Sequence, residues 1–287
     1  MIIDMHSHIG CIMNFKMPKE NLIESMNKYG IDFSICSNCE SAAFDHTGNT
    51  LPYTEQKSQE ETYAESISFA RDNPGKIAVM PWVKPHYEKV TPKLVAMIKE
   101  NLDITAGIKI HPVHSFINFN SPQVEEYIKL AESFNLPVLT HTGNSLESCC
   151  ASVYEMAQKY PKVNFVMGHM GLGTDNTEAI EMIKKQKNLY GDTAWVPMES
   201  AVLAIKECGA DKIMFGTDNP IDGVDTLGTN PKGERSLYQQ YFNELKELIT
   251  PEEYENLMYK NALKFFKLEK LIEKSLNDTV NNNINNL

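Results

Sequence analysis

The feature that most constrains the fold of this chain is a regular alternation of short apolar segments with longer amphipathic ones. The short segments are rich in β-branched residues, which favour strands. Among the longer ones, residues 121–135 are typical of a helix, because Ser121 can cap it, Pro122 suits its first turn and its apolar residues keep a helical period. We therefore predict eight strand–helix units, with strands at residues 2–8, 32–37, 76–83, 107–112, 137–142, 164–170, 189–194 and 212–218.

Near-continuous apolar strands joined by helices predict a parallel sheet that helices cover. An open doubly wound sheet usually has a Gly-rich phosphate loop after its first strand, whereas the first strand here is followed by GCIMNFKMPKE. Eight units match one (β/α)8 barrel, the TIM barrel. We predict one barrel domain over residues 1–275, closed by a helix at 260–273, and a disordered Asn-rich tail at 276–287.

Composition narrows the partners and the compartment. The net charge is −11, and of the 27 basic residues only Arg71 and Arg235 are arginine. This composition argues against nucleic acid as a binding partner. The first apolar run lacks the basic region of a signal peptide, and no stretch approaches the roughly 18 apolar residues of a membrane span. We expect a cytoplasmic protein without a membrane partner, with its six cysteines reduced and the C-x-x-C pair Cys36 and Cys39 serving packing.

The first predicted strand, within IIDMHSHIG, carries polar residues at alternating positions. Successive strand side chains point to opposite faces, so Asp4, His6 and His8 are expected to share one face. Two imidazoles on one face at the end of a buried strand can form part of a metal site. The alternative from this stretch alone is a strand that simply ends in polar residues.

The other histidines also follow the strands. In a barrel of this kind the active site lies at the carboxyl ends of the strands. The eight histidines all lie at a predicted strand end or in the segment after one, and they are His6, His8, His46, His86, His111, His114, His141 and His169. Asp218 ends the eighth predicted strand, so we predict a metal site at this rim of the barrel.

Six short motifs, in this order, resemble the amidohydrolase superfamily and its amidohydrolase-related branch. They are D-M-H-S-H, G-I-K-I-H-P, L-T-H-T-G, V-M-G-H-M-G, F-G-T-D-N-P and N-A-L-K-F-F, and the resemblance spans residues 2–268. That branch includes small hydrolases, lactonases and nonoxidative decarboxylases.

The resemblance implies metal ligands. His6 and His8 resemble the first two ligands, His141 the third, and Asp218 a ligand that is also the general base. His169 resembles the histidine that binds a second metal or polarises the substrate, with an indirect, hydrogen-bonded role as the alternative.

Lys109 stands where some relatives carry a carbamylated lysine that bridges two metals. In a site with one metal it is instead expected to contact an anionic substrate, and a lysine that merely extends from the barrel mouth is a third interpretation. Imidazoles and a carboxylate suit Zn²⁺ or a similar divalent ion, so we expect one such ion, or two where a carbamylated Lys109 bridges them.

Further residues are predicted to support this site. Asp4 is expected to orient a metal ligand or a neighbouring strand end from beneath. The histidines in or near loops are candidates for substrate contact, or else only solvated loop residues, and they are His46, His86, His111 and His114. Two long connections, at 40–58 and 219–236, are candidate lids.

The leading hypothesis is a metal-dependent hydrolase of a small amide, lactone or ester that carries a carboxylate, with Asp218 as general base. The alternative is a metal-dependent nonoxidative decarboxylase of an aromatic or unsaturated acid. A barrel without catalytic activity is a third hypothesis. A homodimer is possible, and the expected partner is a small anionic molecule.

Overall fold

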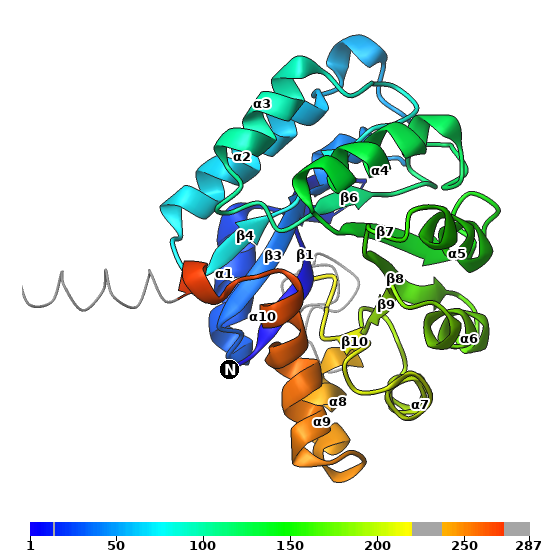
Figure 1. Cartoon of the computed structure of the whole chain (residues 1–287). Helices are drawn as coiled ribbons and strands as arrows, with labels where there is room; N and C mark the ends of the chain where they lie inside the picture. Colours follow the sequence, from blue (N-terminus) through cyan, green and yellow to red (C-terminus); the bar gives the residue numbers. More distant parts are fainter. Residues whose placement is uncertain (14, 220–236, 273–287) are drawn as a thin grey trace, which may run out of the picture.

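The computed structural model describes residues 1–13, 15–219 and 237–272 (Figure 1). The strands are β1 (Ile3–Ile12), β2 (Phe15–Met17), β3 (Phe33–Asn38), β4 (Ile77–Val79), β5 (Trp82–Val83), β6 (Ile108–Ile110), β7 (Val138–Gly143), β8 (Phe165–Leu172), β9 (Leu189–Asp192) and β10 (Ile213–Met214). The α-helices are α1 (Lys19–Tyr29), α2 (Gln59–Asp72), α3 (Pro92–Glu100), α4 (Pro122–Phe134), α5 (Cys150–Lys159), α6 (Thr177–Lys185), α7 (Met198–Cys208), α8 (Leu237–Phe242), α9 (Pro251–Glu255) and α10 (Asn261–Phe265). The predicted tail at 276–287 and nearly all of the candidate lid at 219–236 lie outside the described residues.

Each of the eight predicted strand ranges contains a strand, with two differences in detail. The third range is divided into β4 and β5, which Met80 and Pro81 separate; proline has no N–H to offer a strand ladder. Strand β1 continues past its predicted end at His8 to Ile12 and pairs with the unpredicted antiparallel strand β2.

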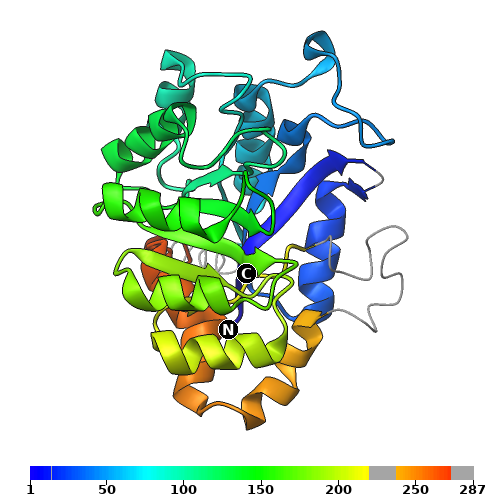
Figure 2. The same ribbon diagram turned by 90° about the vertical axis from the view of Figure 1, so that its right-hand side faces the viewer.

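The strands close into a ring, which confirms the predicted (β/α)8 barrel. Strand pairing gives the orders β2-β1-β3-β4 and β10-β9-β8-β7-β6-β5, and the divided third strand joins them at one side. At the other side the backbone N–H of Met5 donates to Phe215 O at 3.0 Å, and that of Asp218 donates to His6 O at 2.8 Å. Figures 1 and 2 show the helices arranged outside the strands.

Apolar side chains fill the lower part of the barrel. The interior cluster consists of Ile3, Met5, Phe33, Ile35, Ala78, Met80, Ala106, Leu139, Val166 and Met214, with Ala262, Phe266 and Leu268 from the C-terminal region. The single helix predicted at 260–273 is divided: a π-helical turn (Asn256–Lys260) leads into α10, and Lys267 has a φ of 56° before a last helical turn. Of the three residues of this segment expected to point inward, Phe266 and Leu268 are buried, whereas Leu263 is only half-buried.

The helix predicted at 121–135 is α4, and its ends follow the expected chemistry. The Ser121 hydroxyl accepts a hydrogen bond from the backbone N–H of Val124, and Asn135 ends the helix in a left-handed conformation. Among the described residues, no helix is both long enough and apolar enough to cross a membrane.

Lys84, directly after β5, anchors the candidate lid at 40–58. Only 2% of it is exposed. Its ammonium donates to Gln56 Oε1 and to Lys57 O, both at 2.9 Å, and the Glu88 carboxylate lies 3.5 Å away. Because a buried ammonium needs such partners, this lysine fixes the end of the loop against the barrel.

Replacing Lys84 with methionine is expected to lower the free energy of unfolding by about 1–3 kcal/mol, because Gln56 Oε1, Lys57 O and the half-buried Glu88 carboxylate would lose their shared donor. Urea unfolding of the purified variant measures this. The control is Lys57→Met, which removes a lysine that is 43% exposed and is expected to cost at most about 1 kcal/mol. Equal losses in the two variants would contradict the anchoring role.

Candidate functional site

Strand β1 brings two histidines to the barrel mouth, but the predicted strict alternation is interrupted. The ladder between β1 and β3 shifts register between Asp4 and Ser7. Asp4 reaches toward the segment after β10, where it accepts hydrogen bonds from the N–H of Thr217 at 3.1 Å and from its hydroxyl at 2.6 Å. It also accepts from the backbone N–H of His6 at 3.0 Å. This buried carboxylate therefore ties the end of the eighth strand to β1.

Two glycines leave room for the His6 ring. A Cβ atom at Gly216 would lie 3.0 Å from His6 Cβ, and one at Gly168 would lie 3.2 Å from His6 Cε1. Both contacts are tighter than ordinary packing allows. The glycines in VMGHM and FGTD thus admit the imidazole between β8 and β10.

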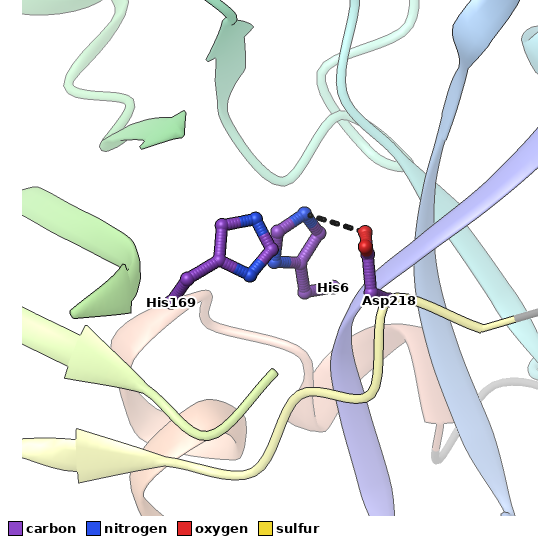
Figure 3. Close-up of side chains that lie close together, drawn as sticks. All are labelled: His6, His169 and Asp218. Atoms are coloured by element: carbon purple, nitrogen blue, oxygen red, sulfur yellow. Dashed lines mark ion pairs between the residues drawn. The ribbon is translucent and has the colours of Figure 1, made fainter. Parts of the chain in front are cut away.

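His6, His169 and Asp218 form the tightest group of potential metal ligands among the described residues (Figure 3). One ligand atom from each lies within 4.8 Å of the others, and all three residues are buried. The distance from His6 Nε2 to Asp218 Oδ1 is 3.4 Å. The barrel thus brings β1, β8 and the segment after β10 to one point.

Hydrogen-bond partners assign the protons of the two imidazoles. His6 Nδ1 lies 2.7 Å from Asp192 Oδ2, and His169 Nδ1 lies 3.0 Å from Ala194 O. Both partners accept, so each Nδ1 carries the proton and each Nε2 keeps its lone pair. Burial lowers the pKa of His169 to about 4 and that of His6 well below its usual value, which keeps both rings neutral. Neutral imidazoles with a free Nε2 lone pair are in the form that binds metals.

His8 and His141 flank this group. His8 Nε2 lies 2.8 Å from Asp218 Oδ1, and its Nδ1 lies 3.0 Å from Ser37 Oγ. The His141 ring lies 4.8 Å from the His169 ring, centre to centre. The predicted ligands therefore lie together, with His169 in the tightest group and His141 beside it.

Lys109, on β6, points into the centre of the site. Its ammonium donates to His6 Nε2 at 2.7 Å and lies 5.8 Å from the centre of a Trp82 ring. Only 1% of the residue is exposed. Burial lowers its pKa to about 8, and the carboxylates of Asp218 and Asp192 oppose that effect. A lysine held here is within reach of any anion that enters the site.

Asp218 is held in its ionised form. Burial by itself would raise its pKa, but the hydrogen bond from His8 holds the pKa well below its usual value. Trp195 donates its indole N–H to the second oxygen, Oδ2, at 2.8 Å. Asp218 is therefore a buried, charged carboxylate with both oxygens engaged.

The backbone is strained where it presents these groups. His169, Trp195 and Asp218 have φ values of 70°, 59° and 62°, in the left-handed region that non-glycine residues rarely occupy. Such residues cost about 1–3 kcal/mol each and cluster at functional sites. Their concentration around one carboxylate supports a functional role for this part of the rim.

Asp192, at the end of β9, belongs to the site although the sequence analysis did not identify it. Its Oδ2 accepts from His6 Nδ1, and its Oδ1 accepts from the backbone N–H of His169 at 2.8 Å and of Ala194 at 3.2 Å. Burial raises its pKa to about 6. Its place at the end of a predicted strand was the available signal. A carboxylate behind an imidazole orients the ring and strengthens its binding to a metal.

Replacing Asp192 with asparagine is expected to weaken divalent-metal binding by about 10–100-fold, because the amide lacks the charge that holds the His6 ring. Calorimetric titration of the metal-free protein with Zn²⁺ or Mn²⁺ measures the affinity. The control is Asp211→Asn, at an exposed carboxylate before β10. An unchanged affinity in the Asp192 variant would contradict its role.

A cavity of about 160 Å³ opens beside these groups. It is lined by His6, His8, Ile12, Met13, Phe15, Cys39, Trp82, Lys109, His111, His114, His141, His169, Leu172 and Asp218. One wall is a stack of rings, in which His111 lies 3.7 Å from His114 and 4.0 Å from His141 between ring centres. The cavity combines this flat wall and apolar side chains with one lysine and the ligand group.

The candidate substrate contacts divide into two pairs. His111 and His114 line the cavity. His46 and His86 are exposed and, within the described part of the chain, neither of them is among its lining residues. Cys39 also lines the cavity. Burial raises the pKa of Cys36, the other cysteine of the C-x-x-C pair, to about 12, so the Cys36 thiol stays protonated.

A family model described as amidohydrolase matches residues 3–268. No curated protein matches the chain. Solved structures match across almost the whole barrel. A 5-carboxyvanillate decarboxylase from Novosphingobium aromaticivorans, with bound manganese, has a TM-score of 0.71 at 12% identity, over 93% of this chain and 97% of that one.

Two further solved structures resemble the chain. A 2,6-dihydroxybenzoate decarboxylase has a TM-score of 0.63 at 12% identity, over 93% of this chain and 99% of that one. A probable 2-pyrone-4,6-dicarboxylic acid hydrolase from Acinetobacter baumannii has a TM-score of 0.60 at 12% identity, with the same two coverages. At these identities the likeness concerns the fold alone, and the barrel has served both reaction types.

Proposed function

Because the chain belongs to the amidohydrolase family, we propose that it is a metal-dependent hydrolase of a small amide, lactone or ester that carries a carboxylate. The observation that carries this proposal is the ionised Asp218, buried beside neutral imidazoles in the wall of the cavity. A buried charged carboxylate is normally paired with a cation, and a strongly shifted pKa is typical of a group that transfers protons in catalysis.

The residues present suit a divalent ion. His6 Nε2 and His169 Nε2 carry lone pairs, and Asp218 adds a negative charge within 4.8 Å of both. His6 Nε2 already accepts the Lys109 ammonium, so it faces a position suited to a cation. We propose that the ion is held by His6, His8, Asp218 and His169 or His141, and that it is Zn²⁺, with Mn²⁺ the alternative. When bound, the ion would act as a Lewis acid and lower the pKa of water to about 7.

The chain's own groups then have separate tasks. Asp218 takes the proton from the attacking water, since its low pKa keeps it ionised at neutral pH. Asp192 fixes the His6 ring, and Asp4 fixes Thr217, the residue before Asp218. Because the Nδ1 proton of His169 goes to Ala194 O, we assign its Nε2 to metal binding rather than to donating a hydrogen bond to the substrate.

The substrate is proposed to be a small anion. Lys109 supplies the positive charge, and a pKa of about 8 leaves it protonated at neutral pH. His111 and His114 are proposed to contact the rest of the substrate from the stacked wall. A carbamylated Lys109 that bridges two ions is the alternative, and the intact protein's mass would reveal it as one added carbon dioxide.

Decarboxylation is the second candidate, and the cavity's composition favours it. Beside Lys109 the wall is formed by apolar groups that include Phe15, Trp82 and Leu172, which suits a flat unsaturated carbon skeleton with one carboxylate. Two of the similar structures, the 2,6-dihydroxybenzoate and 5-carboxyvanillate decarboxylases, act on aromatic acids.

One assay distinguishes these reactions. Protein loaded with Zn²⁺ or Mn²⁺ is incubated with small carboxylated lactones and esters, whose hydrolysis is measured as proton release, and with carboxylated amides, whose hydrolysis is measured as release of the amine. The same protein is incubated with aromatic and unsaturated acids, and release of carbon dioxide is measured. Turnover in the first set supports hydrolysis, and turnover in the second supports decarboxylation instead. Activity that Asp218→Asn retains in full would arise outside this site, and inactivity of both loaded forms on every substrate would contradict the enzymatic proposal.

A further inference from the structure

Both tryptophans of the chain lie at the site. Trp82 lines the cavity, whereas Trp195 lies in the segment after β9 and contacts Asp218. The indole N–H of Trp195 donates to Asp218 Oδ2 at 2.8 Å, and the side chain is partly buried. No motif in the sequence assigns a role to Trp195.

The two residues are held by a short bridge between neighbouring strand ends. The Thr193 hydroxyl donates to Gly216 O and accepts from Gly216 N–H, both at 3.0 Å. Trp195 lies two residues beyond Thr193, and Asp218 lies two beyond Gly216. Both Trp195 and Asp218 adopt positive φ, so the chain accepts strain at both ends of their hydrogen bond.

The contact divides the two oxygens of Asp218 between different tasks. Oδ1 faces His8 Nε2 at 2.8 Å and His6 Nε2 at 3.4 Å, while Oδ2 accepts the indole N–H with one lone pair and keeps the other for a proton. We propose that Trp195 is a positioning residue that holds Oδ2, so that Asp218 offers a single oxygen, Oδ1, to the bound ion. This inference rests on the proposed metal-dependent function.

An indole suits this task for a chemical reason. It has one N–H donor, no acceptor and no charge, so it can neither bind the metal nor neutralise Asp218. A lysine in its place would compete with the cation, and a serine would have lone pairs of its own.

The first experiment measures metal affinity. Metal-free Trp195→Phe is titrated with Mn²⁺, and its dissociation constant is expected to rise about tenfold, since outer contacts of metal ligands contribute 10–100-fold. Tyr259→Phe, at a half-buried aromatic residue packed against the apolar cluster in the lower part of the barrel, is the control and is expected to keep the wild-type affinity. Equal affinities of Trp195→Phe and the wild type would overturn the inference.

A double-mutant cycle tests whether Trp195 acts through Asp218. In Asp218→Ala, which has no carboxylate to orient, adding Trp195→Phe is expected to leave the Mn²⁺ dissociation constant unchanged. A further tenfold rise there would mean that Trp195 supports the site in another way, and the inference would fail.

Fluorescence tests the contact without any metal and separates the two possible failures. In Trp82→Phe, Trp195 is the sole tryptophan, and its emission is expected to shift when Asp218→Ala removes the acceptor of its N–H. Identical spectra would refute the contact and with it the inference. The spectra can differ while neither the wild type nor any variant binds Zn²⁺ or Mn²⁺. In that case the proposed function fails, and the positioning role fails with it. If metal binds and Trp195→Phe has no effect, the inference alone fails.

Discussion

Asp218→Asn is expected to reduce kcat/KM by about 10³-fold, within the range observed when a general base is removed. The amide has nearly the same shape and can still accept the Trp195 hydrogen bond through its oxygen. The amide lacks the negative charge that Asp218 carries because its pKa is low, and it cannot take a proton. Steady-state kinetics on the substrate found by the paired assay measures the loss.

Asp72→Asn is the matched control, because Asp72 is an exposed carboxylate on α2, away from the cavity. Its kinetics are expected to equal those of the wild type. Circular dichroism of both variants checks that the barrel is intact. If Asp218→Asn kept more than about a tenth of the activity, Asp218 would not be the general base.

Removal of divalent ions is expected to abolish turnover and to lower the melting temperature. The donors from His6, His169 and Asp218 lie together only in the folded barrel, so an ion that binds them stabilises the folded state alone. At a thousandfold excess over its dissociation constant, this amounts to about 4 kcal/mol, or roughly 10 °C for a chain of this size. Activity and thermal unfolding, each measured with chelator and after adding back Zn²⁺ or Mn²⁺, test this.

Recovery of activity with only one of the two ions would identify the ion that the site uses. Addition of Ca²⁺ serves as the control, since it prefers six to eight oxygen ligands and the site offers mainly nitrogen. Full activity in the presence of a chelator that removes bound metal would contradict the prediction.

The barrel could be predicted because strands covered on both faces leave uninterrupted apolar runs in the sequence. The division of the third strand was visible in principle, since Pro81 lies inside the predicted range 76–83. Strand β2 was not, because the three residues of FKM show no repeating pattern and gain their place by pairing with β1.

The same physics limits what could be predicted of the site. Residues within strands, such as His6 in β1 and His169 in β8, are placed by the ladder and reach a common point. His46 and His86 lie in connections that no ladder positions, and they are exposed. Trp195 has its contact through a positive φ, which a pattern of apolar and polar residues does not encode.

Metal content per chain tests the central claim most directly. Elemental analysis of the purified protein, after exposure to Zn²⁺ or Mn²⁺ and removal of the excess, should find one equivalent bound, or two if Lys109 is a carbamylated bridge. His6→Ala, which removes the imidazole that Asp192 and Lys109 both hold, should retain far less. A wild-type chain with less than about a tenth of an equivalent under these conditions would contradict the account.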